Sequence, residues 1–273
     1  MIRIFKAHIN FILKAKNEHG VHSPFVFNLV TKCFYDKTKY SEYGQIKRYR
    51  QSLLKNKSSI KVSDFGAGSR VFKSNIRTIT AIAKNAGIKP KEAQLLFRLV
   101  NYFKPCNILE IGTSLGIATS ALKLGNPKAK ITTLEGCPKT LNIAKQQFEQ
   151  LKLENPNISF INTEFSKYLT KNRETTYDFV YFDGNHSKEA TLEYFELLLP
   201  TINNDTLWVF DDIHWSLDMN EAWKQIQNHP VVSVSIDTLQ WGMVFFRKEQ
   251  NKEHFVINPE KNLSSFLFEK IKI

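Results

Sequence analysis

The sequence predicts an α/β protein: a doubly wound, mostly parallel sheet of seven strands with an antiparallel strand at its end, preceded by a helical N-terminal segment. From residue 107 onward, short apolar runs alternate with amphipathic helical patterns, as in a parallel sheet with helices on both faces. Two strand-like runs near the C-terminus are separated by only a short turn, which favours an antiparallel pair. The 273 residues suffice for one such core and an accessory segment.

The first part of the chain is expected to be helical. Ser23 and Pro24 form an N-cap and a first-turn proline, which predict a helix to about Phe34. Further helices are predicted over 41–54, 74–84 and 91–103. The first 20 residues are interpreted as an amphipathic helix of the mature protein, because no long apolar stretch or cleavage site follows. The predicted domains are 1–90 and 91–273.

Periodicity also locates the elements of the sheet domain. Strands of the parallel part are predicted at 107–111, 131–135, 158–162, 179–182 and 207–210, and the antiparallel pair at 231–236 and 242–246. The helices between them are predicted near 117–124, 139–153, 166–169, 188–198 and 217–227.

Charge is unevenly distributed along the chain. Residues 1–104 carry a net charge of +16, and the remainder −4. The basic half is either a solvated helical surface or a surface that attracts an anionic substrate, nucleic acid or a membrane. No apolar run approaches the roughly 18–20 residues of a transmembrane helix, so no such segment is expected. The three cysteines are far apart in the sequence, which predicts neither disulfides nor a zinc site. Free cysteines favour a reducing, cytoplasmic location.

The strongest motif is ILEIGTSLGIAT, a buried strand that breaks into a glycine turn and then a helix. Gly112 and Gly116 permit a tight turn, whereas Ser114 stands where a dinucleotide-binding protein has glycine, which disfavours a pyrophosphate site. Glu135 ends the second strand, 23 residues after Gly112, where a carboxylate can accept both ribose hydroxyls of an adenosine. The pattern predicts nucleoside binding; a purely structural strand-to-helix turn is the alternative.

Together with YDFVYFDGNH and LWVFDDIHW, this motif resembles the class I S-adenosylmethionine-dependent methyltransferases, most closely the catechol O-methyltransferase-like group. The resemblance covers about residues 91–249. It implies a Rossmann-like sheet, S-adenosylmethionine as methyl donor and a hydroxyl of a small molecule as acceptor. It also implies donor-binding roles for residues around the methionine part (Glu110, Gly112, Ser114, Gly116, Asp183), at the ribose (Glu135) and at the adenine (Cys137, Glu164). Glu164 departs from the usual pattern, since Thr163-Glu164-Phe165 stands in place of G-D-A.

Carboxylates follow two neighbouring strands, at Asp183, Asp211 and Asp212. Three carboxylates at one sheet edge repel one another unless a cation joins them, and hard divalent ions prefer oxygen ligands. The metal-dependent members of the resembled group carry Asp, Asp and Asn here, so Asp212 departs from the pattern. Mg²⁺ or another divalent cation is therefore expected. In the alternative, Asp212 caps the next helix or faces solvent, and Asp183 only orders the donor.

His186 follows Asp183 by three residues, and the sequence DGxH resembles a branch that methylates sugars and natural products, such as the macrocin and cephalosporin-pathway enzymes. The catechol enzymes have a lysine near this point. An imidazole can accept a proton from an alcohol, so His186 is predicted to be catalytic, beside Asp183. The alternative is a structural histidine that orients its loop. His214 is a weaker candidate for base or ligand.

Residues 62–69 form a second glycine-rich sequence, which lacks a following ribose carboxylate and is interpreted as a loop, with Arg70 and Lys73 available to an anion. With nearby aromatic side chains, this loop predicts that residues 1–90 form a lid over a small acceptor that is anionic or strongly polar. The alternatives are methylation of RNA or DNA by way of the basic half, and a binding protein that retains only the fold. A homodimer is compatible with the sequence. The aromatic residues in question are Phe25, Phe27, Phe34, Tyr35, Tyr40 and Tyr43.

Overall fold

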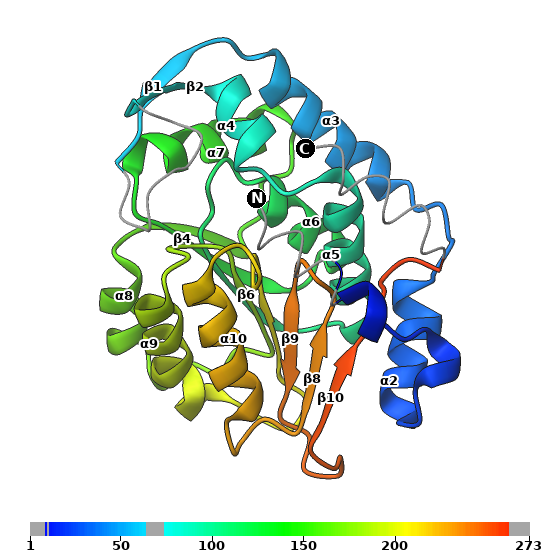
Figure 1. The fold of residues 1–273 in the computed structure, drawn as a ribbon. Coiled ribbons are helices and arrows are strands. Elements are labelled where there is room, and N and C mark those ends of the chain that lie inside the picture. The colour runs from blue at the N-terminus through cyan, green and yellow to red at the C-terminus, as the bar shows by residue number, and fades with distance from the viewer. Residues whose placement is uncertain (1–8, 10, 64–73, 262–273) are drawn as a thin grey trace.

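An eight-stranded sheet forms the centre of the computed structural model, which describes residues 9, 11–63 and 74–261 (Figure 1). Strand β9 alone runs against the other seven, because it pairs antiparallel with both β7 and β8. In spatial order the strands are β10 (Glu253–Val256), β8 (Val234–Asp237), β9 (Gly242–Phe245), β7 (Leu207–Phe210), β6 (Phe179–Phe182), β3 (Asn107–Ile111), β4 (Lys130–Glu135) and β5 (Ile158–Asn162).

Helices cover both faces of this sheet. Strands β6 and β7 are buried along their whole length, as the central strands of such a sheet must be. One apolar core joins the first face to α5 (Pro90–Phe103), α6 (Ile117–Gly125) and α7 (Pro138–Gln150). A second core joins the other face to α8 (Phe165–Lys171), α9 (Lys188–Leu198), η3 (Leu199–Thr201) and α10 (Leu217–Asn228). The predicted doubly wound, mostly parallel fold is confirmed.

The sheet has one strand more than the seven predicted. The additional strand, β10, pairs in parallel with β8 at the edge of the sheet. Two of its four residues, Glu253 and His254, are exposed, so its sequence lacks a continuous apolar run. An edge strand needs only one apolar side, which explains why periodicity did not reveal it.

The N-terminal segment is mostly helical, as predicted, with one error. Residues 76–78 were expected in a helix but form a strand, because Thr78 is the N-cap of the following helix and accepts from the backbone N of Ala81 at 3.2 Å. This strand pairs antiparallel with its neighbour in a separate two-stranded sheet. The segment comprises η1 (Glu18–Gly20), α2 (Pro24–Leu29), the π-helical turn η2 (Val30–Phe34), α3 (Glu42–Lys55), β1 (Ser59–Lys61), β2 (Ile76–Thr78) and α4 (Ile79–Asn85).

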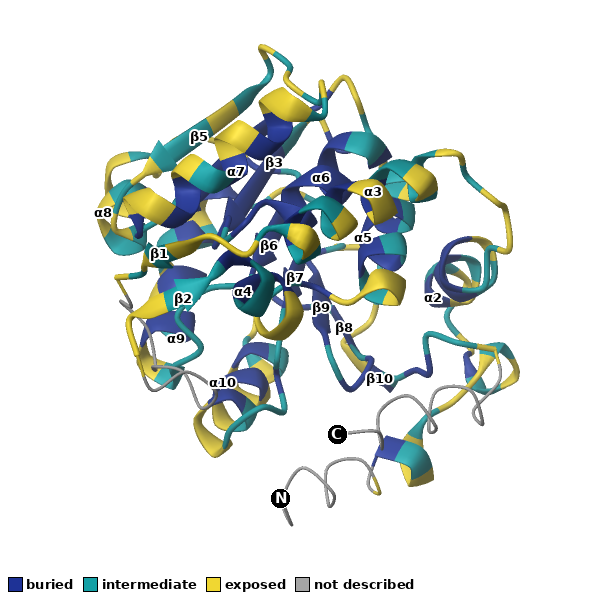
Figure 2. Cartoon of the chain, turned by 90° about the horizontal axis from the view of Figure 1, so that it is seen from above, coloured by how far each residue is buried: buried dark blue, intermediate teal, exposed yellow. Residues whose placement is uncertain are grey.

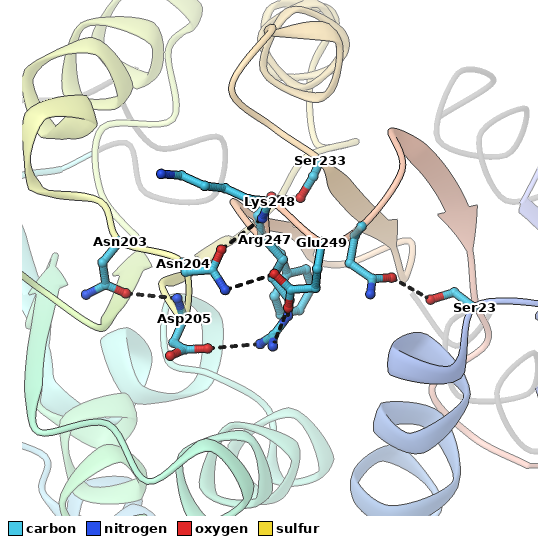
Figure 3. A network of polar contacts seen from close by, with 10 residues as sticks. Ser23, Asn203, Asn204, Asp205, Ser233, Arg247, Lys248 and Glu249 are labelled. Atoms are coloured by element: carbon cyan, nitrogen blue, oxygen red, sulfur yellow. Dashed lines mark hydrogen bonds and ion pairs between the residues drawn. The ribbon is translucent and has the colours of Figure 1, made fainter.

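Helix α2 packs at the amino-terminal edge of the parallel strands. The rings of Phe25 and Phe245 lie 4.9 Å apart, and Phe245 pairs with Leu207, the first residue of β7. The guanidinium of Arg247 lies 4.8 Å from the centre of the Phe25 ring. Figure 3 shows Arg247 held by polar contacts to Asp205 and Glu249, and Ser23 reaching the loop after β9.

The aromatic residues expected in a lid therefore have other positions. Phe34 is buried in the core, and Tyr40 and Tyr43 pack against Phe97 of α5. These residues, with Phe25, pack in the apolar core on the outside of α5 and at the amino-terminal edge, so their positions lend no support to the predicted lid. Residues 1–8 and 10 of the predicted N-terminal helix, and the glycine loop over 64–69 with Arg70 and Lys73, lie outside the described residues.

Candidate functional site

The predicted site residues follow four strands whose carboxyl ends meet at one edge of the sheet. Gly112 follows β3, Glu135 ends β4, Asp183 follows β6 and Asp211 follows β7. Ligands of open parallel sheets bind outside this edge. Figure 2 looks onto it and shows buried strands at the centre, surrounded by helices and by the β1–β2 pair.

The glycine turn after β3 adopts a backbone that excludes most residues. Gly112 has φ +107°, and a Cβ there would overlap the carbonyl oxygen of Asp183. Ser114 and Gly116 also have positive φ, of 48° and 76°. The backbone N atoms of Gly112 and Thr113 donate to the Leu134 carbonyl at 3.0 and 2.9 Å. The turn is thus held tightly across the end of β4.

Glu135 connects this turn to the loop after β4. Its Oε2 accepts from the backbone N of Ser114 at 2.9 Å, and its Oε1 accepts from the backbone N of Cys137 at 2.8 Å. A carboxylate offers about four acceptor positions, so an orientation fixed by backbone donors is compatible with binding two adjacent hydroxyls. Three predicted donor-site residues are therefore in direct contact.

Glu110 lies fully buried below the turn. Its Oε2 accepts from the hydroxyls of Thr119 and Thr133, whereas its Oε1 has no hydrogen-bond partner among the described residues. Burial raises the pKa of Glu110 to about 8, opposed by the two hydroxyls and reinforced by Glu135. A buried carboxyl oxygen without a partner is rare in native proteins and is suited to receive a polar group of a ligand.

A second group of carboxyl groups lies at the ends of β6 and β7. Burial, followed by the charges of Asp211 and Asp212, raises the pKa of Asp183 well above its usual range. Burial, with Asp212, raises the pKa of Asp211 to about 8, although the Gln240 amide opposes this shift. The amide Nε2 of Gln240 donates to Oδ1 of Asp211 at 2.9 Å and to Oδ1 of Asp212 at 2.6 Å. The raised pKa values and the hydrogen bonds from Gln240 both reduce the repulsion among these carboxyl groups.

The described residues do not show the predicted magnesium site. The described part of the chain contains no set of three or more His, Cys, Asp or Glu side chains arranged to hold a metal ion. Asp212 has a left-handed backbone, with φ 55°, and its carboxylate accepts from the Gln240 amide. That Asp183, Asp211 and Asp212 form one ligand set therefore stays a prediction from the sequence.

His186 lies beside Asp183, as the DGNH sequence predicts. Its Nε2 is 3.6 Å from Oδ1 of Asp183, and its ring centre is 6.1 Å from that of Trp215. Burial lowers the pKa of His186, with Asp212 opposing the shift, while 25% of its side-chain surface remains exposed. A neutral imidazole at this edge can accept a proton.

His214 has a structural role. Its Nε2 lies 2.7 Å from Oδ2 of Asp237, and its Nδ1 lies 2.7 Å from the amide nitrogen of Asn220. Both ring nitrogens are engaged, so this histidine links the loop after β7 to β8 and α10. It is not available as a catalytic base.

The two residues predicted near the adenine differ in exposure. Cys137 is buried at the start of α7, and its Sγ accepts from the backbone N of Ser63 at 3.3 Å. Glu164 is exposed at the end of β5, on the same edge as Glu135. Gln240 and the two threonines that hold Glu110 were not predicted, because no local pattern relates them to the glycine turn.

Comparisons with known proteins agree with this arrangement. Residues 109–213 match the family described as "Methyltransferase domain". Over these residues the chain is therefore similar to a methyltransferase domain. The matched range contains the glycine turn, Glu135, Asp183, His186 and Asp211, whereas α3 and Gln240 lie outside it.

Solved structures of methyltransferases share the fold. A Podospora anserina methyltransferase bound to S-adenosylhomocysteine has a TM-score of 0.58 and 14% identity, covering 84% of this chain and 97% of that one. A Bacillus cereus O-methyltransferase with S-adenosylhomocysteine has a TM-score of 0.53 and 19% identity, covering 77% and 92%. A Streptomyces achromogenes O-methyltransferase with S-adenosylmethionine has a TM-score of 0.53 and 12% identity, covering 77% and 91%. No helix among the described residues is long and apolar enough to cross a membrane.

Proposed function

We propose that the protein transfers a methyl group from S-adenosylmethionine to a hydroxyl of a small molecule. The observation that carries this proposal is Glu135, whose carboxylate is oriented at the carboxyl edge by backbone N–H groups of Ser114 and Cys137. The O-methyltransferases of the same fold, solved with S-adenosylmethionine or its product, support both the donor and the reaction type.

Each loop has a role toward the donor in this proposal. Glu135 accepts the ribose hydroxyls, and Cys137 and Glu164 lie on the adenine side. The turn from Gly112 to Gly116, with Asp183, surrounds the methionine part. The unpartnered oxygen of Glu110 lies below this turn and supports a polar or cationic group of the ligand above it.

His186 is the proposed base for the acceptor hydroxyl. The sulfonium of the donor makes its methyl group electrophilic. His186 takes the hydroxyl proton as the oxygen–methyl bond forms and the sulfur–methyl bond breaks, which leaves S-adenosylhomocysteine. Asp183, whose Oδ1 lies 3.6 Å from Nε2, orients the imidazole toward the acceptor. Because burial lowers the pKa of His186, we expect the decrease of activity in acid to occur at a lower pH than for an exposed histidine.

Product formation tests this reaction directly. The full chain is incubated with S-adenosylmethionine and fractions of a small-molecule extract, while S-adenosylhomocysteine formation and products one methyl group heavier are followed. His186→Gln should slow turnover about a hundredfold or more while binding of S-adenosylhomocysteine stays unchanged. The exposed His22 provides the control His22→Gln. Methyl transfer to RNA or DNA in place of small molecules would contradict the proposed acceptor class.

Other properties expected from the sequence stay predictions. Metal assistance rests on the family resemblance, and full turnover in excess EDTA would contradict it. The anionic or polar acceptor rests on Arg70 and Lys73, outside the described residues. The predicted cytoplasmic location agrees with the three free cysteines. Analytical ultracentrifugation, which measures the mass of the protein in solution, tests the predicted homodimer.

A further inference from the structure

We infer that Tyr49, on helix α3 of the N-terminal segment, is a positioning residue for the donor-binding turn. Its hydroxyl donates to the carbonyl of Leu115, the residue after the one whose backbone N–H is bound by Glu135. The inference rests on the proposed function, because it assigns a new residue to the same donor site. Tyr49 lies outside both the matched methyltransferase range and the part of the sequence that resembles the family.

Tyr49 reaches the turn through an enclosed contact. Its side chain is fully buried, and its hydroxyl donates to the carbonyl of Leu115 at 2.9 Å. The ring packs edge-on against Phe148 of α7, with centres 5.4 Å apart. A Cβ on Gly116 would lie 2.6 Å from the Tyr49 oxygen, so the absence of a side chain at 116 admits the hydroxyl.

The turn needs support of this kind. Gly112, Ser114 and Gly116 all have positive φ, and such backbone persists only where the surroundings fix it. Glu135 holds the backbone N of Ser114, and Tyr49 holds the carbonyl of the next residue. The two contacts hold the peptide groups on either side of the Ser114–Leu115 peptide bond, one from a strand and the other from a helix. Burial raises the pKa of Tyr49 well above its usual range, so the hydroxyl remains a donor at any working pH.

The N-terminal segment also contacts the loop after β4, which is the second loop of the proposed donor site. The backbone N of Ser63, just after β1, donates to Sγ of Cys137 at 3.3 Å. Helix α3 is itself anchored by Arg50, whose Nη1 donates to the Ile88 carbonyl at 2.6 Å, and by the buried Leu53. Residues 49–63 therefore support both loops of the proposed donor site, which are the turn after β3 and the loop after β4.

The test compares two tyrosines on one helix in the full chain. Tyr49→Phe removes the hydroxyl and keeps the ring, and Tyr43→Phe does the same where the hydroxyl accepts from Nη1 of Arg98 at 3.2 Å. Affinity for S-adenosylhomocysteine is measured by calorimetry and Tm by thermal unfolding. Tyr49→Phe should weaken binding by about threefold to tenfold, the effect of one hydrogen bond. Tyr43→Phe should stay within about twofold of wild type, with a similar small decrease in Tm in both variants.

Hydrogen exchange of the unmodified chain gives a second readout that does not depend on a variant. Addition of S-adenosylhomocysteine should slow amide exchange in α3 around Tyr49, which makes no donor contact itself, and leave α2 unchanged. Wild-type affinity in Tyr49→Phe, or unchanged exchange in α3, would overturn this inference alone. If the unmodified chain does not bind S-adenosylhomocysteine, the proposed function is overturned together with it.

Discussion

Glu110 combines full burial, two hydroxyl donors and a carboxyl oxygen without a partner in the described structure. Its pKa of about 8 in the folded state lies above the usual 4.5, so between these values the folded chain binds a proton that the unfolded chain releases. The stability contributed by this group is therefore lost as pH rises from about 5 to 8. Glutamine, which has the same shape and no charge, would not lose stability in this way as pH rises.

We predict that Glu110→Gln increases Tm relative to wild type more at pH 8 than at pH 5. The difference should be at least on the order of 1 kcal/mol, or about 2–4 °C. The exposed Glu149 on α7 supplies the control, Glu149→Gln, which should shift both Tm values equally. Thermal unfolding across this pH range measures the effect, and parallel Tm profiles for wild type and Glu110→Gln would refute it.

At the residue scale, the sequence placed several residues of the proposed donor site at one edge of the sheet. Gly112 and Glu135 could be placed together because each ends a strand of one parallel sheet, and the carboxyl ends of such strands share an edge. Gln240 and Tyr49 could not be assigned to the site from the sequence. They come from a later turn and an earlier helix, and only tertiary packing brings them to the site. The three aspartates were placed at the right edge, but their orientations depend on Gln240.

At the scale of elements, the bounds of strands were predicted accurately where an apolar run is flanked by polar residues or glycine. Strands β3, β5, β6 and β7 have the bounds that the sequence indicates. Edge strand β10 and strand β2 were missed because polar residues interrupt the first and a threonine N-cap follows the second. In the proposed function the turn between β3 and α6 positions the donor, and the conformation of this turn depends on glycine.

We predict that Gly112→Ala destabilises the protein by more than about 2 kcal/mol, because the backbone has φ +107° and the new Cβ overlaps the Asp183 carbonyl. Gly44→Ala in helix α3 is the control: a Cβ there meets nothing within 4 Å, so stability should rise by about 0.5–1 kcal/mol. Urea unfolding measures both variants. Equal effects of the two substitutions would show that the turn tolerates a side chain.

At the scale of the molecule, the N-terminal segment has two attachments with different consequences. Helix α2 braces the amino-terminal edge of the sheet, and α3 with β1 reaches the donor loops at the opposite edge. Sequence alone could not reveal this division, because both attachments join residues far apart in the chain. Stability and donor binding should therefore respond separately to substitutions in α2.

We predict that Phe25→Ala lowers stability by about 1–3 kcal/mol, since it removes the contacts with Phe245 and Arg247, while affinity for S-adenosylhomocysteine stays unchanged. Phe27, two residues away and 43% exposed, is the matched control, and its alanine variant should change stability by no more than about 0.5 kcal/mol. Unfolding and calorimetry are run on the same samples. A loss of donor affinity in Phe25→Ala would show that the two edges are coupled.

The central claim is that Glu135 holds the ribose of S-adenosylmethionine at the carboxyl edge. Calorimetric titration of S-adenosylhomocysteine into the full chain, into Glu135→Ala and into the exposed-site control Glu154→Ala tests it most directly. We predict saturable one-to-one binding to wild type and Glu154→Ala. In Glu135→Ala, binding should be weaker by roughly 1.5–3 kcal/mol, about 10-fold to 150-fold, because the ribose hydroxyls lose a charged acceptor. Equal affinity of Glu135→Ala and wild type, or no binding to wild type, would contradict the account.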